Sequence, residues 1–173
     1  SPVVWRRFYS TANGARSALG LGWTCEYFRH LEPRDGTLWM SGPEGHEHGF
    51  APPAGSAAAE IIGHQWELRR AGDEYMLFDR RRAERLFFAR DRSRTTERYS
   101  LRRIEDLSGN RITLAYDEWD RLTAIEQESL QRRFEIAYGD RRLIERILFT
   151  APGWRPEVLV TYAHDDAGRL IAS

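Results

Sequence analysis

Two histidines flank a glutamate in the segment His46-Glu47-His48, and another histidine follows at His64. On a strand, residues two apart lie on the same face, and two imidazoles on one face can ligate zinc. No carboxylate or thiol at the spacing of a familiar metal site accompanies them. The ordinary alternative is a polar hairpin next to glycines. We therefore expect no metal site here and no cofactor in the chain.

The segment 79–103 carries ten arginines against four acidic residues, with Phe87, Phe88 and Tyr99 among them. Basic residues interleaved with aromatic ones are typical of nucleic-acid surfaces. However, the segment 105–128 carries seven acidic residues against two arginines. Neighbouring strands of opposite charge can pair across a sheet. We favour such pairing and do not expect nucleic acid as a partner.

Two groups of aspartates could perform acid–base chemistry, namely Asp117 with Asp120 and Asp165 with Asp166. Paired carboxylates serve that purpose only when their surroundings separate their pKa values. Both groups lie in predicted turns, where aspartate accepts hydrogen bonds from backbone amides. The single cysteine, Cys25, has no disulfide partner in the chain and is predicted to be a buried strand residue. No residue pattern marks an activated nucleophile, so we expect that the chain is not an enzyme.

Strands must position these residues, because apolar and polar residues alternate along much of the chain. In the segment 111–116, Ile112, Leu114 and Tyr116 occupy every second place, and the segments 133–138 and 158–162 have the same pattern. Strict alternation places each apolar triplet on one face of a strand. We therefore predict an all-β fold of antiparallel hairpins.

The first part of the chain is expected to form less regular hairpins. Strands or hairpins are predicted at 3–9, 23–31, 36–50, 66–78 and 84–89. Two turns are predicted at Gly42-Pro43-Glu44-Gly45 and Ala71-Gly72-Asp73, where glycine permits tight backbone geometry. Residues 51–59 are predicted to form a connector rich in Pro, Gly and Ala, and residues 55–62 one or two helical turns.

The tyrosines that close the three alternating segments recur at a regular spacing. Tyr116, Tyr138 and Tyr162 are separated by 22 and then 24 residues. A period of about 20–25 residues is typical of repeat architectures. About 22 residues accommodate two strands of five or six residues with their turns. Each unit is therefore predicted to be a strand, a turn and a returning strand.

These units carry a resemblance to a known family. Tyr116-Asp117 followed by Asp120-Arg121-Leu122, and Tyr162 followed by Asp166-Ala167-Gly168-Arg169-Leu170, resemble the tyrosine–aspartate (YD) repeats of Rhs proteins. The same repeats occur in the C component of bacterial Tc toxins and in teneurins. The sequence departs from the family pattern at Asp120 and Arg142, where Gly is usual, and at Gly139, where Asp is usual.

The N-terminal part resembles the segment that opens the Rhs shell, through Trp5-Arg6-Arg7-Phe8-Tyr9-Ser10 and Leu19-Gly20-Leu21-Gly22-Trp23. The resemblance thus spans nearly the whole chain and divides it into an irregular hairpin region, 1–98, and continuous YD-type repeats, 99–173. The repeat positions that it assigns a structural role are Trp5, Trp23, Tyr116, Asp117, Arg121, Leu122, Tyr138, Leu143, Tyr162, Gly168, Arg169 and Leu170.

The resemblance implies a wall segment of a hollow β-cocoon. In Rhs and Tc-toxin C proteins, the repeats wind as a long antiparallel sheet around a C-terminal toxin until its delivery into a target cell. Delivery is commonly by type VI secretion or by the Tc injection complex. The family cleaves itself with aspartates near the distal end of the shell, and that motif is not found here. The resemblance therefore supplies no catalytic residue.

The partners implied are the rest of the shell, the enclosed toxin, and a secretion spike or chaperone that a preceding region would reach. The implied localisation is that of a secreted effector of interbacterial competition, stored in the bacterial cytoplasm before delivery. One alternative is an extracellular adhesion or carbohydrate-binding module built on the same repeats. Another is a free-standing enzyme or nucleic-acid binder, which activity of the isolated chain would support. A toxin domain further along the same gene would favour the shell, and a signal peptide with cell-wall anchoring would favour the module.

Composition limits the remaining classes of function. The 173 residues include 26 basic and 26 acidic ones, and every basic residue is an arginine, so the formal net charge is zero. A neutral chain has no overall electrostatic attraction for nucleic acid or for an anionic membrane. No apolar stretch approaches the roughly 20 residues of a membrane span, and no signal peptide is visible. We therefore do not expect a membrane as a partner.

Overall fold

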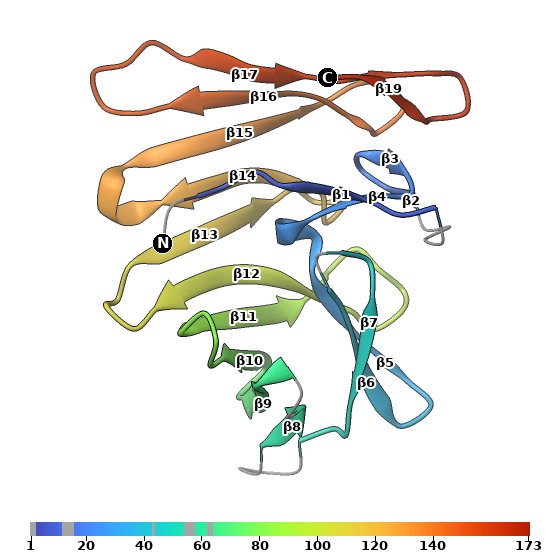
Figure 1. Cartoon of the computed structure of the whole chain (residues 1–173), viewed down its shortest axis with the longest axis vertical. Helices are drawn as coiled ribbons and strands as arrows, with labels where there is room; N and C mark the ends of the chain where they lie inside the picture. The colour runs from blue at the N-terminus through green and yellow to red at the C-terminus, as the bar shows by residue number, and fades with distance from the viewer. Residues whose placement is uncertain (1–2, 12–15, 43, 54–57, 62–63) are drawn as a thin grey trace.

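The computed structural model of the chain describes residues 3–11, 16–42, 44–53, 58–61 and 64–173. Within these residues, β-strands make up nearly all of the regular structure, and neighbouring strands pair antiparallel (Figure 1). The prediction of an all-β antiparallel fold is therefore confirmed.

The elements before residue 62 are β1 (Arg7–Tyr9), β2 (Arg16–Ser17), β3 (Gly20–Leu21), β4 (Trp23–Cys25), the 3-10 helix η1 (Glu26–Phe28), β5 (His30–Arg34), β6 (Thr37–Ser41), β7 (Glu47–Phe50) and β8 (Ala59–Ile61). The later elements are β9 (Trp66–Ala71), β10 (Glu74–Asp79), β11 (Glu84–Arg90), β12 (Tyr99–Asp106), β13 (Arg111–Tyr116), β14 (Leu122–Gln127), η3 (Glu128–Leu130), β15 (Arg132–Tyr138), β16 (Ile144–Thr150), β17 (Glu157–Thr161), β18 (Ala163–His164) and β19 (Leu170–Ala172).

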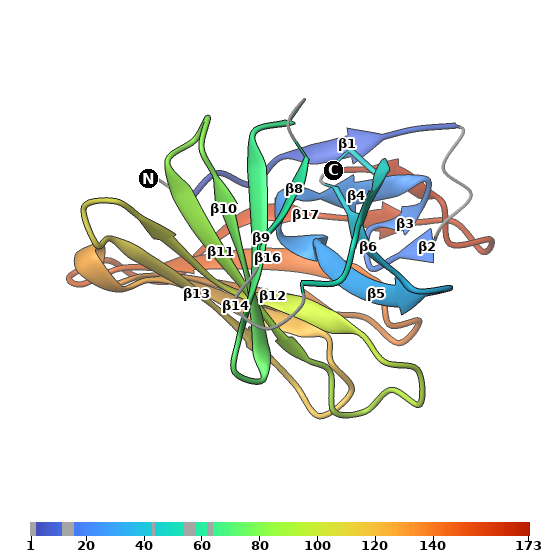
Figure 2. The ribbon, with the colours of Figure 1, turned by 90° about the horizontal axis from the view of Figure 1, so that it is seen from below.

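One sheet of thirteen strands dominates the structure. Ten of its strands follow each other in chain order from β8 to β17, so that each pairs with its neighbour in sequence. Figure 2 shows that β9 to β11 are turned steeply relative to β15 to β17, so the sheet twists strongly along its length. Short ladders of β1 with β4, β2 with β3, and β18 with β19 accompany it.

The sheet forks at β12. One side of β12 pairs with β11 along most of its length. On its other side, Arg103 to Glu105 pair with β13, whereas Tyr99 and Ser100 pair with β5. The strands β13 to β17 therefore continue in one direction and β5 to β7 in another, and the two branches separate at β12.

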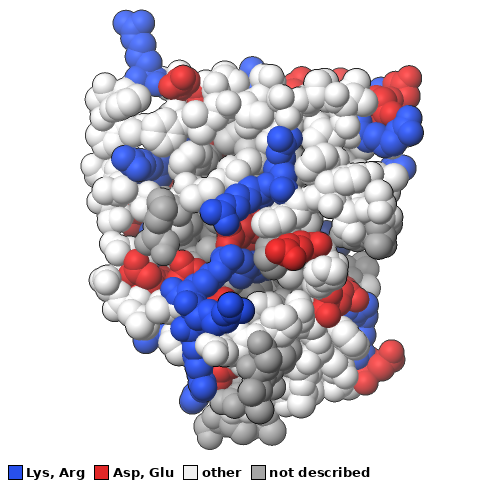
Figure 3. All heavy atoms as spheres, viewed as in Figure 1, with Lys and Arg blue, Asp and Glu red and all other residues white. Residues whose placement is uncertain are grey.

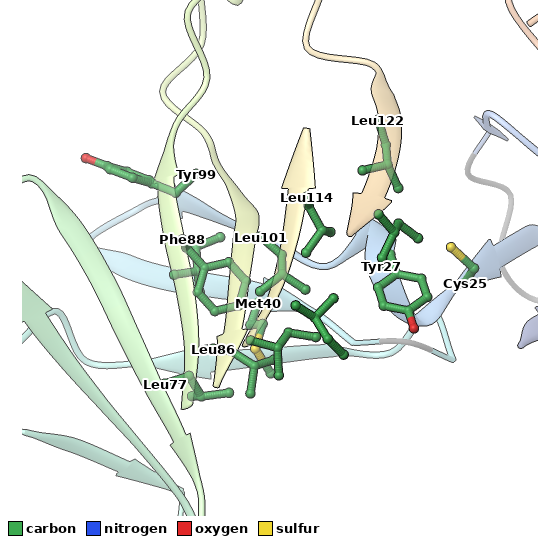
Figure 4. Packing of buried hydrophobic residues seen from close by; sticks show 14 of the residues in the cluster. Cys25, Tyr27, Met40, Leu77, Leu86, Phe88, Tyr99, Leu101, Leu114 and Leu122 are labelled. Atoms are coloured by element: carbon green, nitrogen blue, oxygen red, sulfur yellow. The ribbon is translucent and has the colours of Figure 1, made fainter. Parts of the chain in front are cut away.

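The core lies between these branches and the N-terminal strands. Leu77, Leu86, Leu101 and Leu114 come from four successive strands and are all buried, as is Met40 of β6 (Figure 4). Cys25 and Tyr27, from the segment that includes β4 and η1, extend the same apolar cluster. Burying apolar surface from both sides of the fork stabilises the position of the N-terminal strands on the sheet.

Several predicted elements differ from those observed, for identifiable reasons. The segment 3–9 is a strand only at Arg7–Tyr9, because both the amide and the carbonyl of Val4 hydrogen-bond to the hydroxyl of Tyr27 instead of to a strand. The segment 23–31 is interrupted by η1, which follows Cys25 directly and ends at Phe28, where Arg29 returns to extended backbone.

Two further expectations need correction. The helical turn predicted at 55–62 is wrong where the chain is described, because Ala59–Ile61 forms strand β8, and the rest of that segment lies outside the described residues. The strict alternation expected at 158–162 is broken by a β-bulge, since Val158 and Val160 pair with consecutive residues of β16. Leu159 is therefore the extra residue on β17, and the strand ends before Tyr162.

Candidate functional site

An aspartate organises the turn between β13 and β14. The Oδ1 atom of Asp117 accepts hydrogen bonds from the amides of Trp119 at 3.0 Å and Arg121 at 2.9 Å. Its Oδ2 atom accepts a third hydrogen bond from Nε of Arg121 at 2.7 Å. One carboxylate thus satisfies two backbone donors and pairs with the arginine that leads into β14, so the Asp-x-x-x-Arg spacing has a direct structural cause.

The turn between β18 and β19 repeats this arrangement. Asp165 accepts from the amides of Ala167 at 3.0 Å and Arg169 at 2.8 Å, and from Nε of Arg169 at 2.7 Å. These hydrogen bonds, led by the one from the Arg169 amide, hold the pKa of Asp165 below its usual value. Gly168 takes the left-handed backbone conformation, with φ of 76°, that this turn requires.

A third turn of the same kind was missed in the sequence. Between β12 and β13, Asp106 accepts from the amides of Ser108 at 2.9 Å and Asn110 at 3.0 Å, and from Nδ2 of Asn110 at 2.8 Å. Asparagine thus replaces the arginine of the other turns. The signal was present as Asp-x-x-Gly-Asn, which begins ten residues before Tyr116.

The residues that depart from the family pattern keep the same backbone. In the turn between β15 and β16, the amide of Gly139 donates to the carbonyl of Leu143, and that of Arg142 to Gly139, each at 3.0 Å. The equivalent bonds close the Asp117 turn. Arg142 and Asp120 adopt φ values of 61° and 55°, the conformation that glycine would adopt more easily.

The tyrosines of the first two units link strands through their hydroxyl groups. The hydroxyl of Tyr116 donates to the carbonyl of Leu101 at 2.7 Å, and that of Tyr138 to the carbonyl of Leu122 at 2.9 Å. Burial raises the pKa of both phenols, so they remain protonated donors. A guanidinium group covers each ring, from Arg102 over Tyr116 and from Arg121 over Tyr138.

The tyrosine of the third unit has a different partner. Tyr162 accepts a hydrogen bond of 2.8 Å from Nε1 of Trp5, and Arg7 lies over its ring at 5.2 Å. The guanidinium of Arg7 is also 5.4 Å from the ring of Trp23. The N-terminal segment therefore occupies the place that strand residues occupy in the first two units.

Residues 18–20 also contact the repeats, through hydrogen bonds and a close backbone approach. The amide of Ile144 donates to the carbonyl of Ala18 at 2.7 Å, and Nε2 of His164 lies 3.2 Å from the carbonyl oxygen of Leu19. A β-carbon on Gly20 would lie 2.8 Å from the carbonyl oxygen of Gly168, so only glycine permits this approach. Leu122, Leu143 and Leu170 start or precede the returning strands, as the repeat pattern places them.

The sheet ends in an exposed strand, β17. Among the described residues, β17 pairs only with β16, and its Val158 and Leu159 are 48% and 50% exposed. Trp154, in the loop before it, and Ile171 of β19 are also exposed. An apolar edge strand of this kind offers unpaired backbone groups to a further strand.

Two rings of the histidine cluster pack edge to face. The ring centroids of His48 and His64 lie 4.4 Å apart, and both rings pack against Trp66. His46 is exposed. Across the described ranges, no group of three or more His, Cys, Asp or Glu is arranged to hold a metal ion.

The arginines of the segment 79–103 engage in ion pairs with both local and more distant carboxylates. Arg102 lies 3.1 Å from Asp91 and 3.4 Å from Asp120, and Arg103 lies 3.0 Å from Glu105. Figure 3 shows basic side chains in a broken diagonal band with acidic ones beside it. These arginines are thus paired with carboxylates, but within the basic segment, at a turn or within β12, and not by the expected pairing of oppositely charged neighbouring strands.

Cys25 lies where the sequence indicated, fully buried in β4. Burial raises the pKa of its thiol well above the usual value, which keeps the thiolate form rare. None of the helices that the structure describes is long and apolar enough to cross a membrane.

Comparison with known proteins links the chain to a toxin. Residues 1–50 match a family described as "Domain of unknown function (DUF6531)". Over 174 aligned residues, which cover 98% of this chain, the sequence is 32% identical to "Double-stranded DNA deaminase toxin A" of Burkholderia cenocepacia (strain H111). The chain is a distant relative of a protein named as a toxin. It spans 12% of that protein's length.

Proposed function

We propose that this chain is a wall segment of a hollow β-shell in an Rhs-type polymorphic toxin. The observation that carries the proposal is the recurrence of one aspartate-anchored turn at 106–110, 117–121 and 165–169. The first two turns connect successive strands of the thirteen-stranded sheet, and the third connects β18 to β19 in a two-stranded sheet that follows it in the chain. Repeat units of this kind bury their apolar faces by stacking on neighbours, so a continuous wall is their natural product.

Two further observations support the proposal. The exposed edge of β17 is suited to pairing with another hairpin of the same wall. The relative named as a toxin is much longer than this chain, which matches 12% of it. A wall segment is expected to be a small part of such a protein.

On this proposal the chain acts by enclosure and performs no catalysis. The completed wall keeps the toxin from the cell that makes it, until delivery as a secreted effector. Its partners are then the remaining shell and the enclosed toxin, with a spike or chaperone engaged by other parts of the protein. The turns and tyrosines contribute by holding successive hairpins at a constant spacing.

Limited proteolysis of the complete toxin protein tests the proposal. In the intact protein, the C-terminal toxin part should resist protease. Replacing Val158 and Leu159 together by arginine should open the wall at β17 and expose the toxin part to cleavage, since both side chains lie on the joining strand. Leu107→Arg is the matched control, because Leu107 is 60% exposed in a turn away from that edge.

Two results would contradict the proposal. The first is a toxin part that is cleaved equally fast in the unmodified protein and in the edge variant. The second is an electron-microscopy map of the complete protein in which residues 1–173 form a separate domain with β17 unpaired.

A further inference from the structure

A cleft of about 600 Å³ opens where the sheet forks. Its floor includes Ser100 of β12, and its walls come from His30 of β5 and from Tyr116 at the end of β13. Further lining residues come from the segment 16–24, from the turns at 117–121, 139–143 and 165–169, and from the loop between β11 and β12. The cleft is therefore a direct consequence of β5 and β13 diverging from β12.

Arginines dominate the lining of the cleft. They are Arg16, Arg29, Arg94, Arg98, Arg121, Arg141 and Arg142. The acidic residues that line it are Asp120 and Asp166. Asp120 already accepts a hydrogen bond from the amide of Ser93 at 2.8 Å, and Asp166 pairs with Arg141 at 2.7 Å. The lining thus holds seven arginines and two carboxylates. Carboxylates outside the lining pair with four of these arginines: Glu26 with Arg29 at 3.0 Å, Asp91 with Arg94 and Arg98 at 3.5 and 3.3 Å, and Asp117 with Arg121 at 2.7 Å.

Two of these arginines have buried donor atoms without a hydrogen-bond acceptor among the described residues. They are Nε of Arg29, whose side chain is 4% exposed, and Nε of Arg98. The latter atom lies 3.3 Å from Oδ2 of Asp91, outside hydrogen-bonding geometry. Burial lowers the pKa of both guanidinium groups, and the charge of Arg94 lowers that of Arg98 further. An anionic oxygen in the cleft would relieve this unfavourable environment.

An exposed aromatic ring stands at the same cleft. Trp119 lines it and is 54% exposed, with the guanidinium of Arg121 lying 4.8 Å from its ring. An exposed indole beside arginines is suited to stacking on the flat base of a nucleotide. In the turn, the amide of Trp119 is held by Asp117, so the backbone that carries the ring is fixed.

We infer that the cleft binds a nucleotide, with its phosphate groups at Arg94 and Arg98 and its base at Trp119. The cleft volume falls within the 300–1,000 Å³ typical of small-molecule sites. Guanidinium groups bind phosphate oxygens through paired, charge-assisted hydrogen bonds. An acidic peptide fits less well, because β5 and β12 are paired on both sides and offer no free edge for its backbone.

Titration of the full chain with ATP tests the inference, using calorimetry and tryptophan fluorescence. ATP should bind and change the fluorescence, and added salt should weaken binding because the cleft carries excess positive charge. Arg94→Gln should weaken ATP binding at least about tenfold, the loss expected for a charge-assisted hydrogen bond. Arg155→Gln is the control, because Arg155 is exposed and lies outside the cleft lining.

A second pair of ligands separates the contributions of base and phosphate. Trp119→Ala should weaken ATP binding severalfold and leave pyrophosphate binding unchanged. Arg98→Gln should weaken the binding of both ligands. Because Arg98 is more buried than Arg94, the melting temperature of this variant shows whether it still folds. Arg94→Gln, at a side chain that is 43% exposed, gives the same test without that concern.

Three results would overturn the inference. One is the absence of ATP binding at concentrations up to about 1 mM, the weak end of the affinity range. Another is ATP binding that Arg94→Gln and Trp119→Ala leave unchanged. The last is binding of poly-glutamate with no binding of ATP, which would assign the cleft to an acidic peptide.

Discussion

The indole Nε1 of Trp5 donates a hydrogen bond of 2.8 Å to the phenolic oxygen of Tyr162, across 157 positions of sequence. In the two preceding units, the tyrosine hydroxyl donates to a strand carbonyl instead. The N-terminal segment therefore takes the place of a strand at the third unit. The two ends of the chain stabilise each other through this contact and through Arg7, which lies over the ring of Tyr162.

Replacing Trp5 should weaken this link in two steps. Trp5→Phe removes the hydrogen bond and should lower the free energy of unfolding by about 1 kcal/mol. Trp5→Ala also removes packing against Tyr27 and Phe28, and should lower it by about 2–4 kcal/mol. Urea denaturation measures both values. Trp154→Phe, at a side chain 68% exposed, is the control and should change little. Equal stability of Trp5→Ala and the unmodified chain would show that the link contributes nothing.

Glycine should have opposite effects at two equivalent turn positions. Arg142→Gly removes the steric strain of a side chain in the left-handed conformation. It should increase the free energy of unfolding by about 1 kcal/mol. Asp120→Gly relieves the same strain but removes hydrogen bonds to Ser93 and Arg102, so it should destabilise by about 1 kcal/mol or more. For a chain of this size, about 1 kcal/mol shifts the melting temperature by roughly 2–4 °C. Melting shifts of the same sign would refute the assigned role of Asp120.

His30 should make the chain sensitive to mild acid. Burial and the nearby charge of Arg98 lower its pKa from 6.5 to about 4, and outweigh Glu32, whose Oε1 lies 3.5 Å from the ring. The unfolded chain therefore takes up the proton first as the pH falls. Stability should decrease between about pH 6.5 and pH 4, by at most about 3 kcal/mol from this residue.

The substitution His30→Gln should flatten this part of the pH profile of the melting temperature. The same change at His46, which is exposed, should leave the profile as it is. If His30→Gln melts with the same dependence on pH as the unmodified chain, another group is responsible for the acid sensitivity.

The exposed edge of β17 should cause the isolated chain to associate. Unpaired strand edges recruit other strands, and Val158 and Leu159 add exposed apolar surface. Light scattering coupled to size-exclusion chromatography should show a molecular mass that rises with concentration. Val158→Arg should reduce that rise, whereas Leu107→Arg should not. A constant monomer mass over a hundredfold range of concentration would mean that the edge is already protected.

The edge itself was not predictable from charge. Arg132 and Arg133 belong to β15, which pairs on both sides, and Arg141 and Arg142 lie in a turn. They are therefore not at the end of the sheet. The strand at the end of the sheet is determined by the number of hairpins that pair in sequence. The sequence of one hairpin does not indicate that number.

Local patterns were sufficient to predict many, though not all, of the strands and turns of this protein. The alternation at 111–116 and 133–138 corresponds to β13 and β15, and the sequence Ala71-Gly72-Asp73 to the turn between β9 and β10. The aspartate spacing in the YD-type units corresponds to hydrogen bonds within single turns. All these features depend on residues close together in the chain, where periodicity and backbone geometry leave few alternatives.

Tertiary structure alone decided which distant segments meet. Nothing local indicates that β5 takes a place beside β12, or that Trp5 reaches Tyr162. The cleft depends on the same choice, because its arginines converge only where β5 and β13 separate from β12. Such contacts are selected by the burial of apolar surface from many strands at once, and that free energy belongs to the assembled fold rather than to any one segment.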